Sequence, residues 1–197
     1  ERILFNNLLL ELSAPYAAIF IDGVNDLGRA YNFDETINSN NIKYKLSKTS
    51  NDEIKDYFKE KKPVVLMLGY YECPRLCNLL FNGFALSTKS LEWSIGKEFT
   101  VVTVSIDTRE KPKLAAEKKH AYTKLYGRRS AQGGWHFLTG EQKEITALTR
   151  QVGYRYKYHK KIDQFAHAAV LMFLTPDGQI SRYLYGIDFK YNDLKLA

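Results

Sequence analysis

Two continuous apolar runs, separated by a leucine-rich segment, constrain the fold of this chain most strongly. The first run, residues 64–70, follows Pro63, and the second, residues 99–106, is rich in β-branched side chains. Neither run alternates with polar residues, which is typical of strands buried on both faces of a sheet. The segment between them, residues 74–95, is long enough for a crossover helix. Together they predict a right-handed parallel βαβ unit.

Two further helices are predicted in the second half of the chain. One begins near Pro112, a residue favoured at the first helical position, and stops by Gly127. The other is indicated by Thr139 and Gln142, which have the spacing of a capping box. Gly153 can adopt the left-handed conformation that ends such a helix.

The last clear unit is an antiparallel hairpin. Residues 168–174 and 179–185 are two strand-like segments, and the sequence Thr-Pro-Asp-Gly between them suits a type I turn. A parallel βαβ unit, further helices and a terminal hairpin predict an α/β fold, with one mixed sheet and helices on both faces.

Composition and domain organisation fit one folded domain. Of the 197 residues, 45% are apolar and 26% charged, a balance that excludes a mainly disordered chain. We interpret residues 1–41 as an N-terminal extension with one strand near Ile19, and residues 42–197 as the folded domain. No run of 18 apolar residues occurs, so we expect membrane contact only through an anchor upstream of Glu1.

The chain is basic, with a formal net charge of +7, and should attract acidic partners. The densest patch, residues 154–161, alternates aromatic and basic side chains. Such a pattern suits base stacking, but it is also ordinary for a solvated strand with tyrosines on one face and cations on the other. Because no run of five basic residues occurs, we favour the strand and expect no nucleic-acid partner.

The only two cysteines, Cys73 and Cys77, lie four positions apart. Pro74 disfavours helical backbone at Cys73, which places Cys73 near a helix N-cap and Cys77 in the first turn. The positive end of a helix stabilises thiolates, and Arg75 adds to that effect. A disulfide between such close residues would constrain the unfolded chain little, so a redox pair or a metal site is favoured over a structural bridge.

His167 distinguishes the metal site from the redox pair. It precedes the first hairpin strand, and the loop there should face the sheet edge that carries the cysteines. Two thiolates and one imidazole suit Cu(I), or Cu(II) with one added ligand, whereas zinc needs a fourth group. A single histidine beside an apolar strand is also often structural, so both interpretations stay open. The other histidines have no ligand spacing, and we interpret them as solvent-facing, at a strand edge and within the basic patch: His120, His136 and His159.

Several segments, in order along the chain, resemble the Sco/SenC family. The resemblance runs from roughly residue 54 to residue 185, and its most diagnostic part is the Cys-x-x-x-Cys pattern followed by a distant histidine. The segments that carry it are residues 68–77, 104–107, 137–140, 165–167 and 175–178.

The resemblance implies a thioredoxin-like fold outside the cytoplasm that binds one copper ion through Cys73, Cys77 and His167. Members of the family help assemble the dinuclear copper centre of cytochrome c oxidase, by delivering copper or by reducing that subunit's cysteines. The implied partner is therefore the copper-bearing oxidase subunit or another cuproprotein. The implied location is the periplasm or the extracytoplasmic face of the inner membrane. Asp107 matches an acidic position near the family's site.

Two other functions use the same cysteines. A thiol-disulfide oxidoreductase would reduce a cuproprotein's cysteines, but thioredoxin-like reductases carry Cys-x-x-Cys and a proline before the facing strand. This chain has the longer spacing and no proline between Pro112 and Pro176, where the His167 segment lies instead. A redox or copper sensor would dock a partner once Cys73 and Cys77 are bonded. The sequence therefore leaves enzymatic activity open and favours a metal site.

Overall fold

The computed structural model describes residues 54–74, 76–195 and 197. Its described residues belong to two compact units, a small one at Tyr154–Ala168 and a large one made of the rest. The predicted extension at residues 1–41, with its strand near Ile19, lies outside the described residues, as do the boundary at residue 42 and Arg75. Within the described part of the chain, no helix is both long and apolar enough to cross a membrane.

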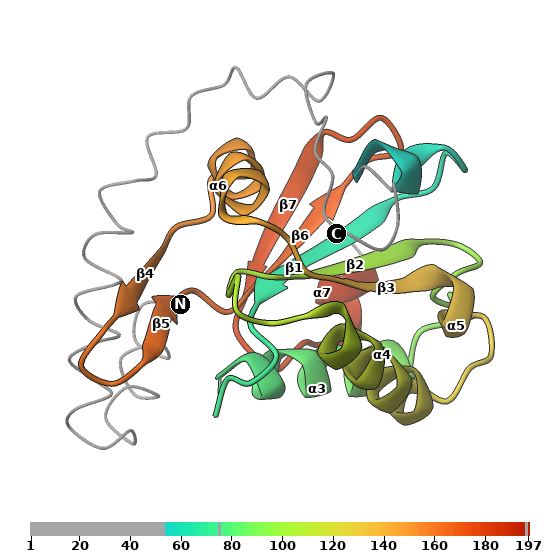
Figure 1. The fold of residues 1–197 in the computed structure, drawn as a ribbon. Helices are drawn as coiled ribbons and strands as arrows, with labels where there is room; N and C mark the ends of the chain where they lie inside the picture. Colours follow the sequence, from blue (N-terminus) through green and yellow to red (C-terminus); the bar gives the residue numbers. More distant parts are fainter. Residues whose placement is uncertain (1–53, 75, 196) are drawn as a thin grey trace, which may run out of the picture. The chain divides into compact units, whose positions relative to one another are not determined.

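The large unit is built on a five-stranded mixed sheet with the strand order β3-β2-β1-β6-β7 (Figure 1). Strands β1 (Val64–Gly69), β2 (Thr100–Ser105) and β3 (Trp135–Leu138) run parallel. Strands β6 (Val170–Leu174) and β7 (Ile180–Tyr185) form the antiparallel side. The predicted parallel unit and the terminal hairpin are both confirmed.

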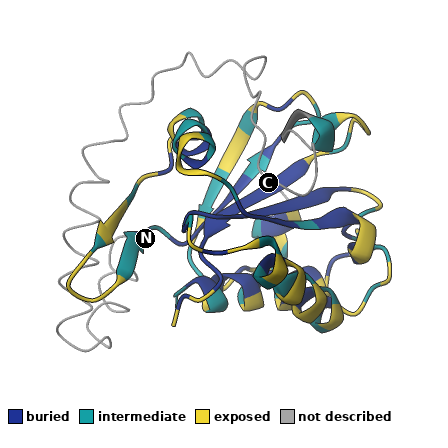
Figure 2. Ribbon diagram, in the orientation of Figure 1, coloured by how far each residue is buried: buried dark blue, intermediate teal, exposed yellow. Residues whose placement is uncertain are grey.

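The two apolar runs lie where their composition requires. Every residue of β1 and β2 is buried, and Figure 2 shows both strands dark blue along their length. β1 is the central strand, paired with β2 on one side and with β6 on the other. Continuous apolar strands are stable only where both faces of the sheet are covered.

One face of the sheet is covered by α3 (Leu76–Thr88) and α4 (Pro112–Tyr126) (Figure 1). An aromatic cluster joins these helices to β3. The ring centroid of Trp135 lies 5.5 Å from that of Phe84 on α3 and 5.9 Å from that of Tyr122 on α4. The buried indole nitrogen of Trp135 also finds a partner, since it donates to the hydroxyl of Thr103 at 3.0 Å.

The opposite face is covered by α6 (Gln142–Gln151), and the strand register shows why the two faces differ (Figure 1). His136 follows Trp135 and points to the other side of the pleat, where the ring of Tyr57 lies 4.5 Å away. The cross-strand partners continue this face to Tyr183, whose hydroxyl donates to the carbonyl of Val152 at the end of α6. Helices therefore cover both faces, as predicted.

Several predicted helix ends are confirmed. Pro112 is the first residue of α4, and Gly127 ends that helix with a φ of 83°. Gly153 follows α6 with a φ of 63°. In the hairpin, the amide of Gly178 donates to the carbonyl of Thr175 at 2.8 Å, which closes the predicted turn.

The predicted capping box is wrong. The N-cap of α6 is Glu141, two residues after Thr139, and it makes no side-chain capping hydrogen bond. Gln142 is the first helical residue, and its side-chain amide donates forward to the hydroxyl of Thr146 at 3.0 Å. In a capping box the glutamine is the third helical residue, whereas Gln142 is the first, so Thr139 and Gln142 do not form one.

The first crossover helix is shorter than the sequence predicted. It ends at Thr88 and does not extend to residue 95. The guanidinium of Arg128 donates to the carbonyls of Lys89, Leu91 and Trp93 at 2.7–2.9 Å. Because these carbonyls are bound by a side chain, the segment is stable without helical hydrogen bonds.

Three short helices in the large unit were not predicted. They are η2 (Ile54–Phe58), α5 (Ala131–Gly134) and α7 (Tyr191–Lys195). Each has at most five residues, too few for a periodic apolar pattern to be recognised.

The small unit is a two-stranded antiparallel hairpin of β4 (Tyr156–His159) and β5 (Gln164–His167). The rings of Tyr156 and Tyr158 both contact Phe165, at 5.9 and 5.0 Å, while Lys157 is exposed. The basic patch is therefore a strand with its tyrosines on one face, as interpreted. Its partner β5 was missed, because four residues are too few to show alternation.

The adjacent glycines of α5 give a matched test of packing. A Cβ on Gly134 would lie 2.1 Å from the Cα of Gly96, whereas a Cβ on Gly133 would meet nothing within 4 Å. We expect Gly134→Ala to lower the free energy of unfolding by about 1–3 kcal/mol, because the backbones must separate. Gly133→Ala should change it by less than about 1 kcal/mol. Urea unfolding checks both, and equal stabilities for the two variants would refute this packing.

Candidate metal centre

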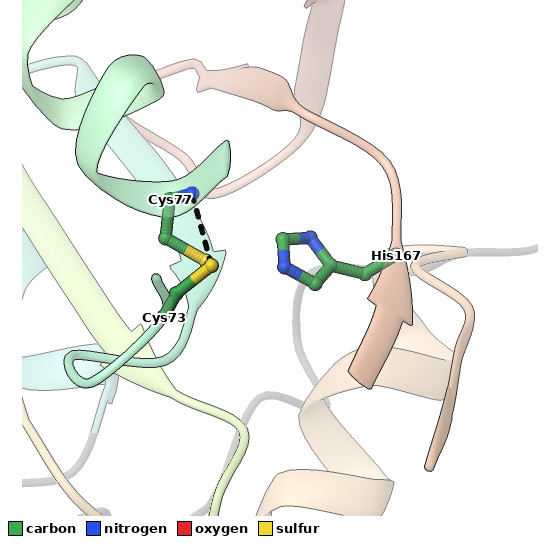
Figure 3. A group of neighbouring side chains, drawn as sticks. All are labelled: Cys73, Cys77 and His167. Atoms are coloured by element: carbon green, nitrogen blue, oxygen red, sulfur yellow. Dashed lines mark hydrogen bonds between the residues drawn. The ribbon is translucent and has the colours of Figure 1, made fainter. Parts of the chain in front are cut away.

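The two cysteines lie at the carboxyl end of β1. Cys73 is in the loop that leaves the strand, and Cys77 is in the first turn of α3 (Figure 3). Neither thiol forms a disulfide, and Cys73 and Cys77 are 5% and 0% exposed. The predicted placement around the start of a helix is therefore confirmed.

Each sulfur accepts a backbone hydrogen bond from the same short segment. The amide of Cys77 donates to the Sγ of Cys73 at 3.4 Å, drawn as a dashed line in Figure 3. The amide of Tyr70 donates to the Sγ of Cys77, also at 3.4 Å. The side chain of Asn78 donates to the carbonyl of Cys73 at 2.8 Å. These contacts hold the two thiols in one turn of chain, with amide dipoles directed at both sulfurs.

Burial is the main influence on the ionisation of Cys77. Desolvation raises the pKa of the Cys77 thiol well above its usual range, and the hydrogen bond and charge of Cys73 raise it further. Desolvation, followed by the charges of Cys77 and Cys73, also raises the pKa of Tyr122 to about 12. The sequence predicted that the positive helix end stabilises the thiolates of both cysteines; at Cys77 desolvation outweighs that effect. A metal that binds this thiol must displace a proton.

Gly69, the last residue of β1, leaves room for the sulfur of Cys77. A Cβ at this position would lie 3.0 Å from that Sγ and 3.3 Å from the ring of Phe81. The strand end and the thiol are therefore packed at a distance that only glycine allows without displacement.

A buried carboxylate, that of Glu110, accepts hydrogen bonds from the cysteine loop. It accepts hydrogen bonds from the backbone amides of Tyr71 and Glu72, both at 2.8 Å, and from the hydroxyl of Ser105 at 2.5 Å. Burial raises the pKa of Glu110, although these three bonds oppose that shift. The sequence analysis missed this residue. Its position shortly after a buried parallel strand was the available signal, because the carboxyl ends of parallel strands share one edge.

The same loop is held by the side chain of Tyr71, which is 1% exposed. Its hydroxyl lies 2.6 Å from the carbonyl of Leu138 and 3.2 Å from that of Thr103. Desolvation, followed by the charge of Glu110, raises its pKa well above the usual range, so the hydroxyl stays a donor.

Asp107, the acidic position noted in the sequence, is buried and paired with Arg109. The guanidinium reaches the two carboxylate oxygens at 2.6–3.0 Å, and the Arg109 amide adds a further bond at 2.9 Å. Arg109 is itself half exposed, so this pair presents a partly accessible cation.

His167 is the last residue of β5 and belongs to the small unit (Figure 3). It is buried, and its Nδ1 lies 3.0 Å from the carbonyl of Ala168. The ring of Tyr154 is 6.2 Å away. A proton on Nδ1 would donate to this carbonyl and leave the Nε2 lone pair for a metal.

The structure places the remaining three histidines at the positions that the sequence predicted. His120 is exposed on α4, which confirms its solvent-facing position. His136 lies in β3, the edge strand of the sheet, and contacts Tyr57. His159 ends β4 within the basic patch.

The sequence matches the SCO1/SenC family over residues 34–191. Among curated proteins there is no significant sequence match.

Solved structures of low sequence identity share the fold. A protein from Aquifex aeolicus VF5, described as a proposed electron transfer protein, has 23% identity and a TM-score of 0.64, covering 79% of this chain and 87% of its own. Arabidopsis thaliana ScoI with copper bound has 21% identity and a TM-score of 0.56, covering 77% and 90%. A SCO1/SenC family lipoprotein from Bacillus anthracis str. Ames has 19% identity and a TM-score of 0.56, covering 73% and 82%. The thioredoxin-like fold is thus confirmed.

The ionisation of Glu110 predicts a pH dependence of stability. Burial raises its pKa in the folded state above the ordinary 4.5, so the folded protein holds this proton more tightly than the unfolded chain. The resulting stabilisation is present below the ordinary pKa and is lost as the pH rises through the raised value. We therefore expect the free energy of unfolding of the wild type, minus that of Glu110→Gln, to fall as the pH increases above about 4.5.

Urea unfolding at a series of pH values measures this difference. Because the variant lacks the titrating proton, its other defects cancel from the slope. A difference that stays flat or increases with pH would contradict the raised pKa.

Proposed function

Since this chain belongs to the SCO1/SenC family, we propose that it is an extracytoplasmic copper-binding assembly factor. It binds one copper ion, its cargo, through Cys73, Cys77 and His167. The recipient is the dinuclear copper centre of cytochrome c oxidase or another cuproprotein.

The observation that carries the proposal is the thiol pair at the start of α3. Both sulfurs are buried, neither forms a disulfide, and the amide of Cys77 bonds to the sulfur of Cys73 at 3.4 Å. Thiolate sulfur is a soft ligand that favours Cu(I) over hard cations. A buried site also excludes the water that zinc or magnesium would retain as a ligand.

His167 supplies the third ligand in this proposal. The two thiols and the imidazole each offer one ligand atom, and all three side chains are buried. The contact between Nδ1 and the carbonyl of Ala168 supports this role, because a metal-bound imidazole usually donates its other N–H to such a group. Three ligands of this kind suit Cu(I), whereas zinc would require a fourth.

Groups of the protein determine how easily the thiols lose their protons and how the resulting negative charge is stabilised. Copper binding releases the thiol protons to solvent. Because the pKa of Cys77 is raised, loss of its proton without a metal is unfavourable. The amides of Tyr70 and Cys77 donate to the sulfurs, so they stabilise the negative charge that the sulfurs acquire.

The descriptions of two structurally similar proteins support the proposed location and cargo. Arabidopsis ScoI is described with copper bound, and the Bacillus anthracis protein is described as a lipoprotein. We propose that this chain also acts on the extracytoplasmic face of a membrane. Its net charge of +7 would favour an acidic partner or surface there.

A thiol-disulfide oxidoreductase is the second candidate, favoured by the different accessibility of the two cysteines. Cys73 is 5% exposed and Cys77 is 0% exposed, so Cys73 is the less buried of the two and is the attacking cysteine in this proposal. Its thiolate would attack the partner's disulfide and form a mixed disulfide. The Cys77 thiolate would then attack Cys73, which releases the reduced partner and leaves a Cys73–Cys77 disulfide.

Copper binding tests the three-ligand site. Titration of the reduced protein against a Cu(I) chelator should give one tightly bound equivalent, and Cys73→Ser or Cys77→Ser should abolish it. We expect His167→Ala to weaken the affinity by about 10–100-fold, comparable to the loss of a supporting group at other metal sites. His120→Ala, an exposed histidine, is the matched control. Equal affinities for the wild type and His167→Ala would remove the imidazole from the site.

The rate of disulfide reduction separates the two candidate functions. If the protein is a reductase, Cys73→Ser should abolish reduction of a cuproprotein's disulfide, while His167→Ala should leave the rate unchanged. For a copper carrier, copper transfer should depend on all three residues. Measuring both rates on the same variants decides between them, and a dependence of reduction on His167 would exclude a simple dithiol mechanism.

A further inference from the structure

We propose that Glu110 is a positioning residue for the two cysteines. Its carboxylate fixes the backbone immediately before Cys73 to the end of β2, so that the thiols are in place before a metal arrives. The effect on copper affinity rests on the proposed function, whereas the effect on the loop concerns the metal-free protein.

The hydrogen bonds of Glu110 converge on one short stretch of chain. One carboxylate oxygen accepts the amide of Tyr71 and the other accepts the amide of Glu72, each at 2.8 Å. Cys73 is the next residue. Two bonds to consecutive amides restrain both the position and the direction of the chain, which a single bond would not.

The carboxylate is also hydrogen-bonded to strand β2. Ser105, the last residue of β2, donates its hydroxyl to Glu110 at 2.5 Å. β2 is buried throughout and paired with strands on both sides. The loop is therefore attached through Glu110 to a strand that is buried and paired on both sides.

Tyr71 provides a second attachment of the same peptide segment. Its hydroxyl donates towards the carbonyl of Leu138, the last residue of β3, and that of Thr103 in β2. Side chain and backbone of one residue are thus bound to neighbouring strands. Rotation of the loop about Tyr71 would break several buried hydrogen bonds at once.

The free-energy cost of burying Glu110 is offset by its hydrogen bonds. Glu110 is only 6% exposed. Transfer of a carboxylate from water to the protein interior costs free energy, whereas burial of an apolar side chain of the same size is favourable. Its hydrogen bonds go to the loop amides and to Ser105, so it acts on the thiols through the backbone and not as a ligand.

Three variants test the proposal. Glu110→Gln keeps the shape but replaces one acceptor oxygen with an amide that faces a backbone N–H. Glu110→Asp keeps the charge but is one methylene too short to reach both amides. Glu117→Gln, an exposed residue of α4, is the matched control.

The first measurement uses metal-free, reduced protein. We expect amide hydrogen exchange at Tyr71 and Glu72 to accelerate by about tenfold or more in both Glu110 variants, with β1 amides unchanged. Alkylation of Cys73 by iodoacetamide should accelerate in parallel. The Asp variant separates positioning from charge, since a purely electrostatic effect on the thiols would leave it like the wild type. Thermal unfolding of each variant verifies that it is folded.

The second measurement is Cu(I) affinity, which we expect to fall by about 10–100-fold in both Glu110 variants and to stay unchanged in Glu117→Gln. Unchanged exchange and alkylation would overturn the proposal, and so would faster exchange with unaltered copper affinity in a wild type that binds copper. If the wild type binds no copper at the cysteines, the proposed function fails. The exchange and alkylation rates then decide the positioning role alone.

Discussion

The burial of β1 on both faces is the constraint on which the rest of this structure depends. β1 is the central strand, with a parallel neighbour on one side and an antiparallel neighbour on the other, and each of its residues is buried. Strands pair with both edges of β1 and helices cover both faces of the sheet, and the chain leaves β1 at its carboxyl end. The cysteine loop begins there, directly over the end of β2.

The environment at this edge explains the chemistry of the thiols. The amide of Cys77 at the helix start and the amide of Tyr70 after β1 each donate to one sulfur, yet desolvation raises the pKa of Cys77. A buried Cys77 thiol with a raised pKa suits a protein that takes up a soft metal with release of a proton better than one that must attack partners rapidly. The balance between helix end and burial therefore bears directly on the choice between carrier and reductase.

Local sequence predicted the elements whose signals are long. The two apolar runs were recognisable because they are continuous, and the helix from Pro112 to Gly127 and the final hairpin because turn or helix-end residues mark them. Short or long-range features were not. The hairpin strand β5 has four residues, and the early end of α3 depends on Arg128, almost forty positions further along the chain.

The sequence by itself determined the βαβ unit, the placement of both cysteines at a helix start and membership of the family, since all three depend on neighbouring residues or ordered motifs. Only the tertiary structure decided the hydrogen bonds of Glu110 and the raised pKa of Cys77. Both depend on desolvation and on hydrogen bonds between residues more than thirty positions apart, or on packing from every side. Such contacts leave no pattern in a single sequence, because many residue types can occupy either end.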